Sequence, residues 1–85
     1  MPDRTSDGSP VRVTLYTRPG CHLCEDAVAE LRRLEIGFTE VDVSGDLDLE
    51  AEYGDRIPVI MLDGKEHGYW RVEGARLQRD LAATA

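Results

Sequence analysis

Hydrophobic and polar residues alternate along two stretches in the first half of the chain, 11–17 and 38–43. Both stretches are rich in β-branched or aromatic residues, and a period of two predicts β-strands. The hydrophobic residues that we expect to face the core are Val11, Val13, Leu15, Phe38, Val41 and Val43.

Between these strands the apolar residues recur every three or four positions, which is the spacing of an amphipathic helix. The helix is expected to run from Cys21 or His22 to Glu35, and Gly37 is well placed for its C-terminal stop. The apolar stripe consists of Cys24, Ala27, Val28, Leu31 and Leu34. A helix between two strands implies a right-handed crossover and therefore a parallel pair of strands.

The second half of the chain mixes helix, strand and turn signals. Residues 44–46 (SGD) precede a short helix that ends at Gly54. A continuous apolar run follows at 57–62, and Asp63-Gly64 is a strong signal for a β-hairpin whose second strand covers 65–70.

A closing helix over 73–83 completes the order β-α-β-α-β-β-α. This order predicts one α/β domain over 11–85, with a four-stranded mixed sheet and helices on both faces. Residues 1–10 (MPDRTSDGSP) are polar and show no periodicity, so we interpret them as a disordered leader.

The composition narrows the classes of partner. The chain carries 10 Lys and Arg against 17 Asp and Glu, a net charge of −7, which argues against nucleic acid and against anionic membranes. No apolar run has the length of a transmembrane helix, no secretory signal is visible, and two cysteines are too few for a disulfide framework. We therefore expect a cytoplasmic protein and a monomer.

Both cysteines, Cys21 and Cys24, lie where the first strand passes into the first helix. Only Cys21 is expected at the free amide groups of the helix N-terminus, where the N–H donors and the helix dipole favour a thiolate. Cys24 falls on the apolar stripe and should be buried, but close enough to attack a mixed disulfide at Cys21. The spacing therefore predicts thiol–disulfide exchange, with Cys21 as nucleophile and Cys24 as resolving thiol.

Two other interpretations of the cysteine pair stay open. The two residues are either inert apolar side chains or half of a metal site. A zinc site needs about four ligands, and the rest of the chain offers only His22, His67 and carboxylates. We assign no metal ligand.

Arg18 and His22 flank the first cysteine. The charge of Arg18, three residues before Cys21, either stabilises the thiolate or attracts an acidic tail of a thiol substrate, and the alternative is a solvated loop arginine. A cationic His22 would also favour the thiolate, and the alternative is a surface histidine of little effect.

Three features of the second half are also candidates. Ile57-Pro58 opens a strand, where proline is tolerated, and only about 5–6% of X–Pro bonds in folded proteins are cis. Tyr69 and Trp70 are expected to complete the small core, with a substrate groove as the alternative. Glu73, at the start of the last helix, is most simply a carboxylate that the helix dipole favours.

The segments 15–24 (LYTRPGCHLC), 41–43 (VDV), 56–59 (RIPV) and 62–64 (LDG) together resemble the short bacterial glutaredoxin-like family. The resemblance covers nearly all of 11–82 and implies a thioredoxin fold with a redox-active Cys-x-x-Cys pair. It implies a cis bond before Pro58, with the Ile57 backbone and Pro58 facing Cys21 and presenting themselves to a bound thiol peptide. Arg18 matches the basic residue that glutaredoxins place three positions before the first cysteine.

The resemblance also implies partners. They are a disulfide-containing protein or a small thiol substrate, together with a reductase or a thiol reductant, and no bound cofactor is expected. Glutathione is implied as a co-substrate, but the chain has His67 to Glu73 (HGYWRVE) where glutaredoxins carry a Gly-Gly pair followed by an acidic residue. That glycine-poor end is similar in part to thioredoxin-like glutaredoxins, which take electrons from thioredoxin reductase and reduce ribonucleotide reductase.

The sequence thus favours a small dithiol–disulfide oxidoreductase that serves electron transport and cell redox homeostasis. A metal- or iron–sulfur-binding module that uses the same two thiolates, and a redox-inert interaction domain, are the alternatives. Metal content and the effect of Cys21→Ser distinguish them.

Overall fold

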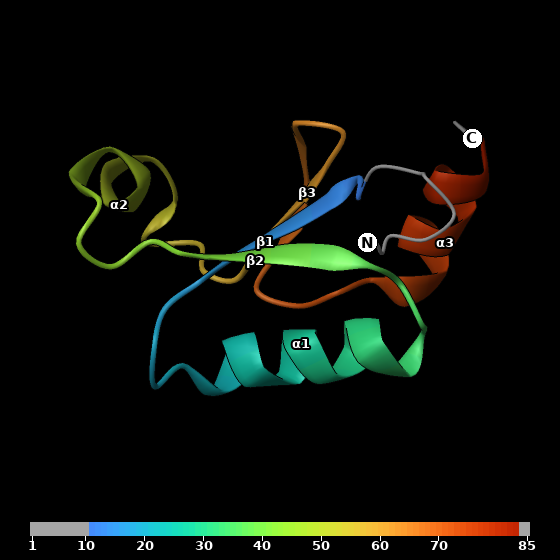
Figure 1. Cartoon of the computed structure of the whole chain (residues 1–85), viewed down its shortest axis with the longest axis horizontal. Helices are drawn as coiled ribbons and strands as arrows, with labels where there is room; N and C mark the ends of the chain where they lie inside the picture. The colour runs from blue at the N-terminus through green and yellow to red at the C-terminus, as the bar shows by residue number, and fades with distance from the viewer. Residues whose placement is uncertain (1–10, 84–85) are drawn as a thin grey trace, which may run out of the picture.

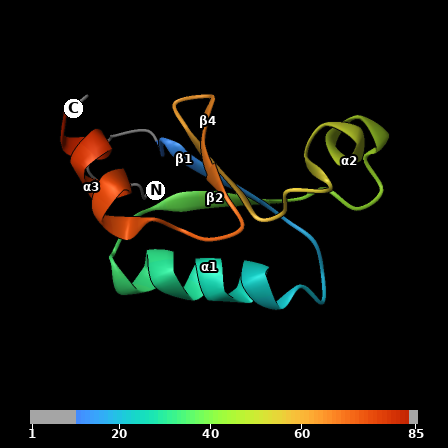
Figure 2. The same ribbon diagram turned by 180° about the vertical axis from the view of Figure 1, so that it is seen from behind.

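The computed structural model describes residues 11–83, so the leader predicted over 1–10 lies outside the described residues. Seven elements follow in the predicted order (Figures 1 and 2). They are β1 (Val13–Thr17), α1 (His22–Arg33), β2 (Phe38–Asp42), α2 (Leu47–Tyr53), β3 (Val59–Leu62), β4 (Lys65–Tyr69) and α3 (Gly74–Ala83). None of the helices in this part of the chain has both the length and the apolar character that crossing a membrane requires.

The four strands form one mixed sheet in the order β2-β1-β3-β4, as predicted. Strands β1 and β2 are parallel, because α1 returns the chain to the same end of the sheet, whereas β3 is antiparallel to both β1 and β4. The turn between β3 and β4 has positive φ at Asp63 (53°) and Gly64 (82°), which is the backbone of a type I′ hairpin.

The main core lies between one face of the sheet and the helices α1 and α3. Leu15 and Ile60 are directly paired across β1 and β3, so their side chains share this face. The completely buried members of the core come from β1, α1, β3 and α3: Val13, Leu15, Ala27, Leu31, Ile60 and Leu77. Figure 1 shows α1 running along the sheet below the strands.

Helix α2 contacts the other face of the sheet. Tyr16 points away from the main core because its neighbour Leu15 points into it, and its ring stacks on Tyr53 of α2 at 4.7 Å between centroids and 16° between planes. Figures 1 and 2 show α2 beyond the end of the sheet at which β1 and β2 finish. The prediction of helices on both faces is therefore confirmed, with α1 and α3 on one side and α2 at the margin of the other.

Two local expectations were wrong. Val11 precedes β1 and its side chain is exposed, so the strand begins at Val13. Helix α1 ends at Arg33 with Leu34 as its C-cap, and not at Gly37, because Glu35 adopts the left-handed conformation (φ 59°) and the Ile36 amide donates to the Leu31 carbonyl. Ile36 packs against the main core, and such a contact commonly accompanies this type of helix end.

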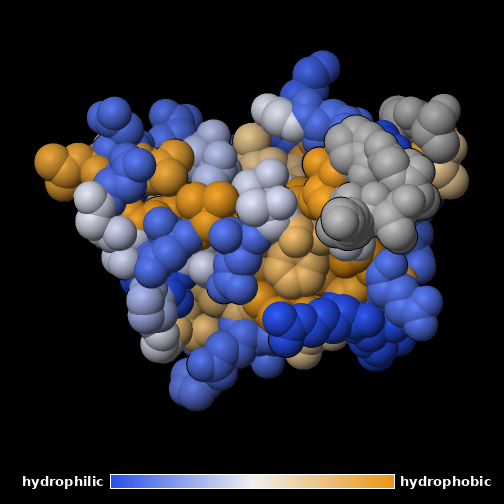
Figure 3. All heavy atoms as spheres, viewed as in Figure 1, coloured by the Kyte–Doolittle hydropathy of each residue, from blue (hydrophilic) through white to orange (hydrophobic). Residues whose placement is uncertain are grey.

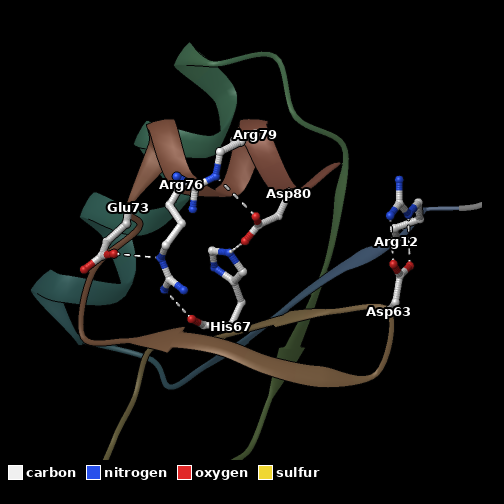
Figure 4. Close-up of polar contacts among 7 residues, drawn as sticks. All are labelled: Arg12, Asp63, His67, Glu73, Arg76, Arg79 and Asp80. Carbon is white, nitrogen blue, oxygen red and sulfur yellow. Dashed lines mark hydrogen bonds and ion pairs between the residues drawn. The ribbon is translucent and has the colours of Figure 1, made fainter. Parts of the chain in front are cut away.

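A polar network fastens α3 to β4 (Figure 4). The buried His67 ring lies with Nε2 2.8 Å from Asp80 Oδ2, while Arg76 donates both to the Glu73 carboxylate and to the His67 carbonyl. At the opposite end of the hairpin, Arg12 donates to both carboxylate oxygens of Asp63 at 2.8 and 2.9 Å. Arg12 Nη1 also donates to the Leu81 carbonyl of α3 at 3.1 Å, so polar contacts of β4 and of Arg12 both hold the last helix in place.

Leu31→Ala tests the main core. We expect it to lower the free energy of unfolding by about 2–5 kcal/mol, because it removes a completely buried side chain from a small core. The same change at Leu47, whose side chain is 81% exposed, should cost less than about 0.5 kcal/mol. Urea unfolding midpoints measure both, and equal losses would contradict the assignment of the core.

Asp80→Asn tests the attachment of α3. The hydrogen bond with His67 holds the pKa of Asp80 below its usual range, with a smaller contribution from Arg79. Its stabilising effect is therefore present above the unfolded carboxyl pKa of about 4 and is lost as the pH falls through the lower folded value. We expect a lower Tm for the variant near neutral pH and a difference that shrinks below about pH 4. A difference that persists in acid would show that shape alone, and not the ionised pair, matters.

Candidate functional site

Cys21 forms the N-cap of α1. Its backbone is extended (φ −96°, ψ 115°), and its Sγ accepts a hydrogen bond from the Cys24 N–H at 3.2 Å. The loop reaches this position because Gly20 has φ +76°, a conformation that side chains rarely adopt. A sulfur therefore occupies the place usually taken by a Ser, Thr or Asp oxygen, directly at the free amides of the helix start.

Cys24 lies one turn behind Cys21 and is buried, with 4% of its surface exposed. It belongs to a second cluster with Val43 and Ile57, against which Cys21 and Tyr53 pack. Burial is the main cause that raises the pKa of the Cys24 thiol to about 12, followed by the hydrogen bond with Cys21. Both cysteines are free in the structure.

A cavity of about 500 Å³ opens beside the two sulfurs, between the start of α1 and the edge strand β2. Its wall includes Cys21 and Cys24, two arginines and two glutamates: Arg18, Arg32, Glu25 and Glu40. The site thus combines a half-exposed sulfur, a buried sulfur and charged groups of both signs.

Arg18 lies on this cavity wall, as expected of a residue near Cys21, but its guanidinium also points toward α2. Its Nη2 is 3.7 Å from Glu50 Oε2 and contributes, behind the hydrogen bonds of Ser44, to the lowered pKa of Asp42. A Cβ at Gly54 would lie 2.5 Å from the Glu50 carbonyl oxygen and 3.2 Å from Arg18 Nη2, so the glycine mainly serves the close approach to the backbone of α2. An effect of Arg18 on the Cys21 thiolate or on a substrate tail stays a prediction.

His22 projects into solvent. Its side chain is 96% exposed, and Nδ1 lies 3.9 Å from Glu25 Oε1. His22 thus lies at the surface, as in the alternative interpretation of a surface histidine. A tuning effect of His22 on the Cys21 thiolate stays a prediction.

Ile57 and Pro58 are joined by a cis peptide bond, as the resemblance implied. Ile57 packs in the cluster of Cys24 and Cys21, so the fold brings residues 36 positions apart in the sequence to one site. Pro58 is completely buried, and its carbonyl accepts from the Trp70 amide at 2.8 Å.

Glu73 does not line the cavity beside the sulfurs. Its carbonyl accepts from the Leu77 amide at the start of α3, and its carboxylate accepts from Arg76 Nε at 2.9 Å. It lines a separate cavity that also reaches Leu23 and Trp70. Glu73 thus lies at a helix start, and a substrate-binding or tuning role of this residue stays a prediction.

The expectation that Tyr69 and Trp70 complete the core was wrong. Their exposed fractions are 46% and 54%, and the two rings meet edge to face with centroids 5.0 Å apart. Trp70 has φ +72°, and this turn at the end of β4 directs both rings to the surface. Exposed apolar atoms are not confined to these rings, since the space-filling view in Figure 3 shows apolar residues close beside charged ones on one face of the molecule.

Glu40 lines the cavity and is hydrogen-bonded to Thr17, but no sequence pattern had singled out either residue. Thr17 is 3% exposed, and its hydroxyl donates to Glu40 Oε2 at 2.9 Å, on the sheet face that α1 covers. Strand alternation carried the signal, because Glu40 shares the face of Phe38, which packs against the main core. Phe38 and Val41 were both expected in the core, although an odd spacing along one strand places them on opposite faces.

The donor side chains of the described residues do not form a metal site. Among residues 11–83, no three or more His, Cys, Asp or Glu side chains come together in a way that could hold a metal ion. Within this part of one chain, the two sulfurs therefore lack the additional ligands that a closed zinc site uses.

The chain is similar to several known proteins. The uncharacterized protein Rv0508 of Mycobacterium tuberculosis is 45% identical over 80 residues, which cover 84% of this chain and 82% of the relative. The X-ray structure of XcR50 from X. campestris has a TM-score of 0.72 at 40% identity and covers 84% of this chain and 96% of that one. The solution structure of Ne2328 from Nitrosomonas europaea has the same TM-score at 27% identity, with 94% and 98% covered.

The crystal structure of a mutant of the thioredoxin-like protein BC3987, at 24% identity and a TM-score of 0.64 over 84% of this chain and 95% of that one, supports the fold alone. The family model of the Glutaredoxin-like domain (DUF836) matches residues 12–82, which is most of the chain. By its sequence, its four-stranded mixed sheet and its Cys21-Cys24 pair, the chain belongs to the glutaredoxin-like family with a thioredoxin-like fold.

Proposed function

We propose that this protein is a small dithiol–disulfide oxidoreductase that exchanges electrons with disulfides through Cys21 and Cys24. The observation that carries the proposal is the contrast between the two sulfurs. Cys21 is partly exposed at a helix N-terminus and accepts the Cys24 N–H, whereas Cys24 is buried one turn behind it. One sulfur is thus arranged to meet a client and the other to release it.

In the proposed reaction, the Cys21 thiolate attacks one sulfur of a client disulfide and forms a mixed disulfide, while the other client sulfur leaves as a thiolate. Cys24 then attacks Cys21 Sγ, and the client leaves as its second thiolate. The cysteines lose two electrons to the client and end as a Cys21–Cys24 disulfide. An external dithiol or a reductase must return the two electrons before the next turnover.

The clients that this site suits are a protein disulfide or a small disulfide, and no bound cofactor takes part. Ile57, packed against the sulfurs, and Pro58 beside it are the backbone at which an extended thiol peptide would lie. Arg18 supplies positive charge near Cys21, and the exposed His22 lies beside the approach to this sulfur. Glutathione is retained as a co-substrate to be tested, against thioredoxin reductase as the alternative electron source.

Selective alkylation tests the division of roles. At pH 7 a thiol with a pKa of about 12 is ionised in only about one molecule in 10⁵, and burial also hinders the reagent. We expect iodoacetamide to modify Cys21 at least about a hundredfold faster than Cys24 in the native protein, and at a similar rate in urea. Peptide mass spectrometry measures both rates, and equal labelling of the native protein would exclude the assignment.

Cysteine variants test the reaction. Cys21→Ser should lose all disulfide reductase activity, whereas Cys24→Ser should accumulate a covalent mixed disulfide with its client, because no thiol is left to release it.

A second experiment identifies the electron source. The wild-type protein is oxidised and then supplied either with glutathione and its reductase or with thioredoxin reductase, and the system that reduces it is the source. Metal analysis of anaerobically purified protein serves as control: stoichiometric zinc or iron bound through both thiolates would favour a metal module, and a fully active Cys21→Ser variant would favour an interaction domain.

A further inference from the structure

The proposed reaction leaves one proton to be accounted for. Cys24 must lose its thiol proton as it attacks Cys21, yet it is 4% exposed and burial raises its pKa to about 12. Dissociation into bulk water alone would leave very little thiolate near neutral pH. Fast release of a client therefore requires a base that reaches the buried sulfur.

Two carboxylates, those of Glu25 and Glu40, line the cavity beside the sulfurs, and their positions differ. Glu25 follows Cys24 on the solvent side of α1, is 72% exposed and lies next to His22. Glu40 projects from β2 toward α1 across the cavity, and the buried Thr17 hydroxyl holds its Oε2. The Glu40 charge also acts on Cys24, as the smallest of the causes that raise the pKa of this thiol. Glu40 is therefore the better placed base.

We propose that Glu40, held by Thr17 at the wall of the cavity shared with both sulfurs, accepts the thiol proton of Cys24 when Cys24 releases the client. The proposal rests on the proposed function, because it concerns the second step of that reaction. Glu40 lies on an exposed edge strand, so the proton that it accepts can pass on to solvent. A cavity of about 500 Å³ has room for water between a carboxylate and a thiol.

The charge balance favours this transfer. An ionised Glu40 beside a Cys24 thiolate would place two negative charges in one cavity, which is why the carboxylate raises the Cys24 pKa. If the proton moves to Glu40 as the sulfur attacks, no second negative charge forms beside the Glu40 carboxylate, and the negative charge leaves with the client thiolate. Arg18 and Arg32 also line the cavity and offset the carboxylate charge that it holds before the transfer.

Each bond that breaks in the second step is matched by one that forms. The Cys24 S–H bond breaks and its proton joins a Glu40 carboxylate oxygen, while the electron pair on Cys24 sulfur forms the bond to Cys21 Sγ. The bond between Cys21 and the client sulfur breaks, and the client leaves with that electron pair as a thiolate. Protonated Glu40 then returns its proton to the client thiolate or to water.

A symmetrical aromatic disulfide with a coloured thiolate product separates the two steps in the full-length protein. Attack by Cys21 releases the first equivalent of coloured thiolate, and attack by Cys24 releases the second from the mixed disulfide. We expect Glu40→Gln to slow the second equivalent about a hundredfold at neutral pH, the usual size of a general-base effect, and to leave the first unchanged. Glu25→Gln, in the same cavity, is the matched control and should slow the second equivalent far less than Glu40→Gln does.

The pH profile separates proton transfer from a merely structural role. Between about pH 6 and pH 8 the rate of the wild-type second step should depend little on pH, because the base belongs to the protein, whereas in Glu40→Gln the rate should rise about tenfold per pH unit as hydroxide takes over. Thr17→Val, which removes the hydroxyl that positions Glu40, should give a smaller slowing with the same wild-type profile. Thermal unfolding of each variant checks that the fold is kept.

Failure of the oxidoreductase function and failure of the Glu40 role alone give different results. A wild-type protein that releases no second equivalent would overturn the oxidoreductase function and the role of Glu40 with it. A normal wild-type second step that Glu40→Gln leaves unchanged in rate and in pH profile would overturn only the role of Glu40.

Discussion

The hydrogen bond from the Cys24 amide to the Cys21 sulfur is the contact on which the site depends. It begins α1 with a sulfur in the capping position, where the amides of the first turn have no backbone partner. A capping group is normally inert, but here the capping atom is also the proposed nucleophile. Helix initiation and sulfur chemistry thus use the same few atoms at the junction of β1 and α1.

The fold makes the two ends of this contact unequal. Cys21 remains at the surface beside the cavity, while Cys24 turns into a cluster with Val43 and Ile57, which arrive from the end of β2 and from the loop before β3. Desolvation is the largest effect on the Cys24 thiol and keeps this sulfur protonated. The asymmetry that a two-step exchange needs is therefore a consequence of which strands meet over the first turn of the helix.

Much of the architecture was predictable because the local signals agree with one another. Alternation, helical spacing, the polar residues 44–46 before α2 and the Asp63-Gly64 turn indicated all seven elements in the right order. The failures have a common cause in packing between elements. Ile36 docks on the core and ends α1 before Gly37, and the turn at Trp70 carries two aromatic rings outward although their apolar character favoured the core.

By itself the sequence determined the position of Cys21 at the start of a helix and of Cys24 on its buried side, because both follow from residue spacing along one element. Only the tertiary structure decided what surrounds the sulfurs. Glu40 and Thr17 meet because β1 and β2 are parallel neighbours in one register, and Ile57 reaches Cys24 because β3 lies beside β1. Such contacts join residues far apart in the chain, so no local pattern of polarity encodes them.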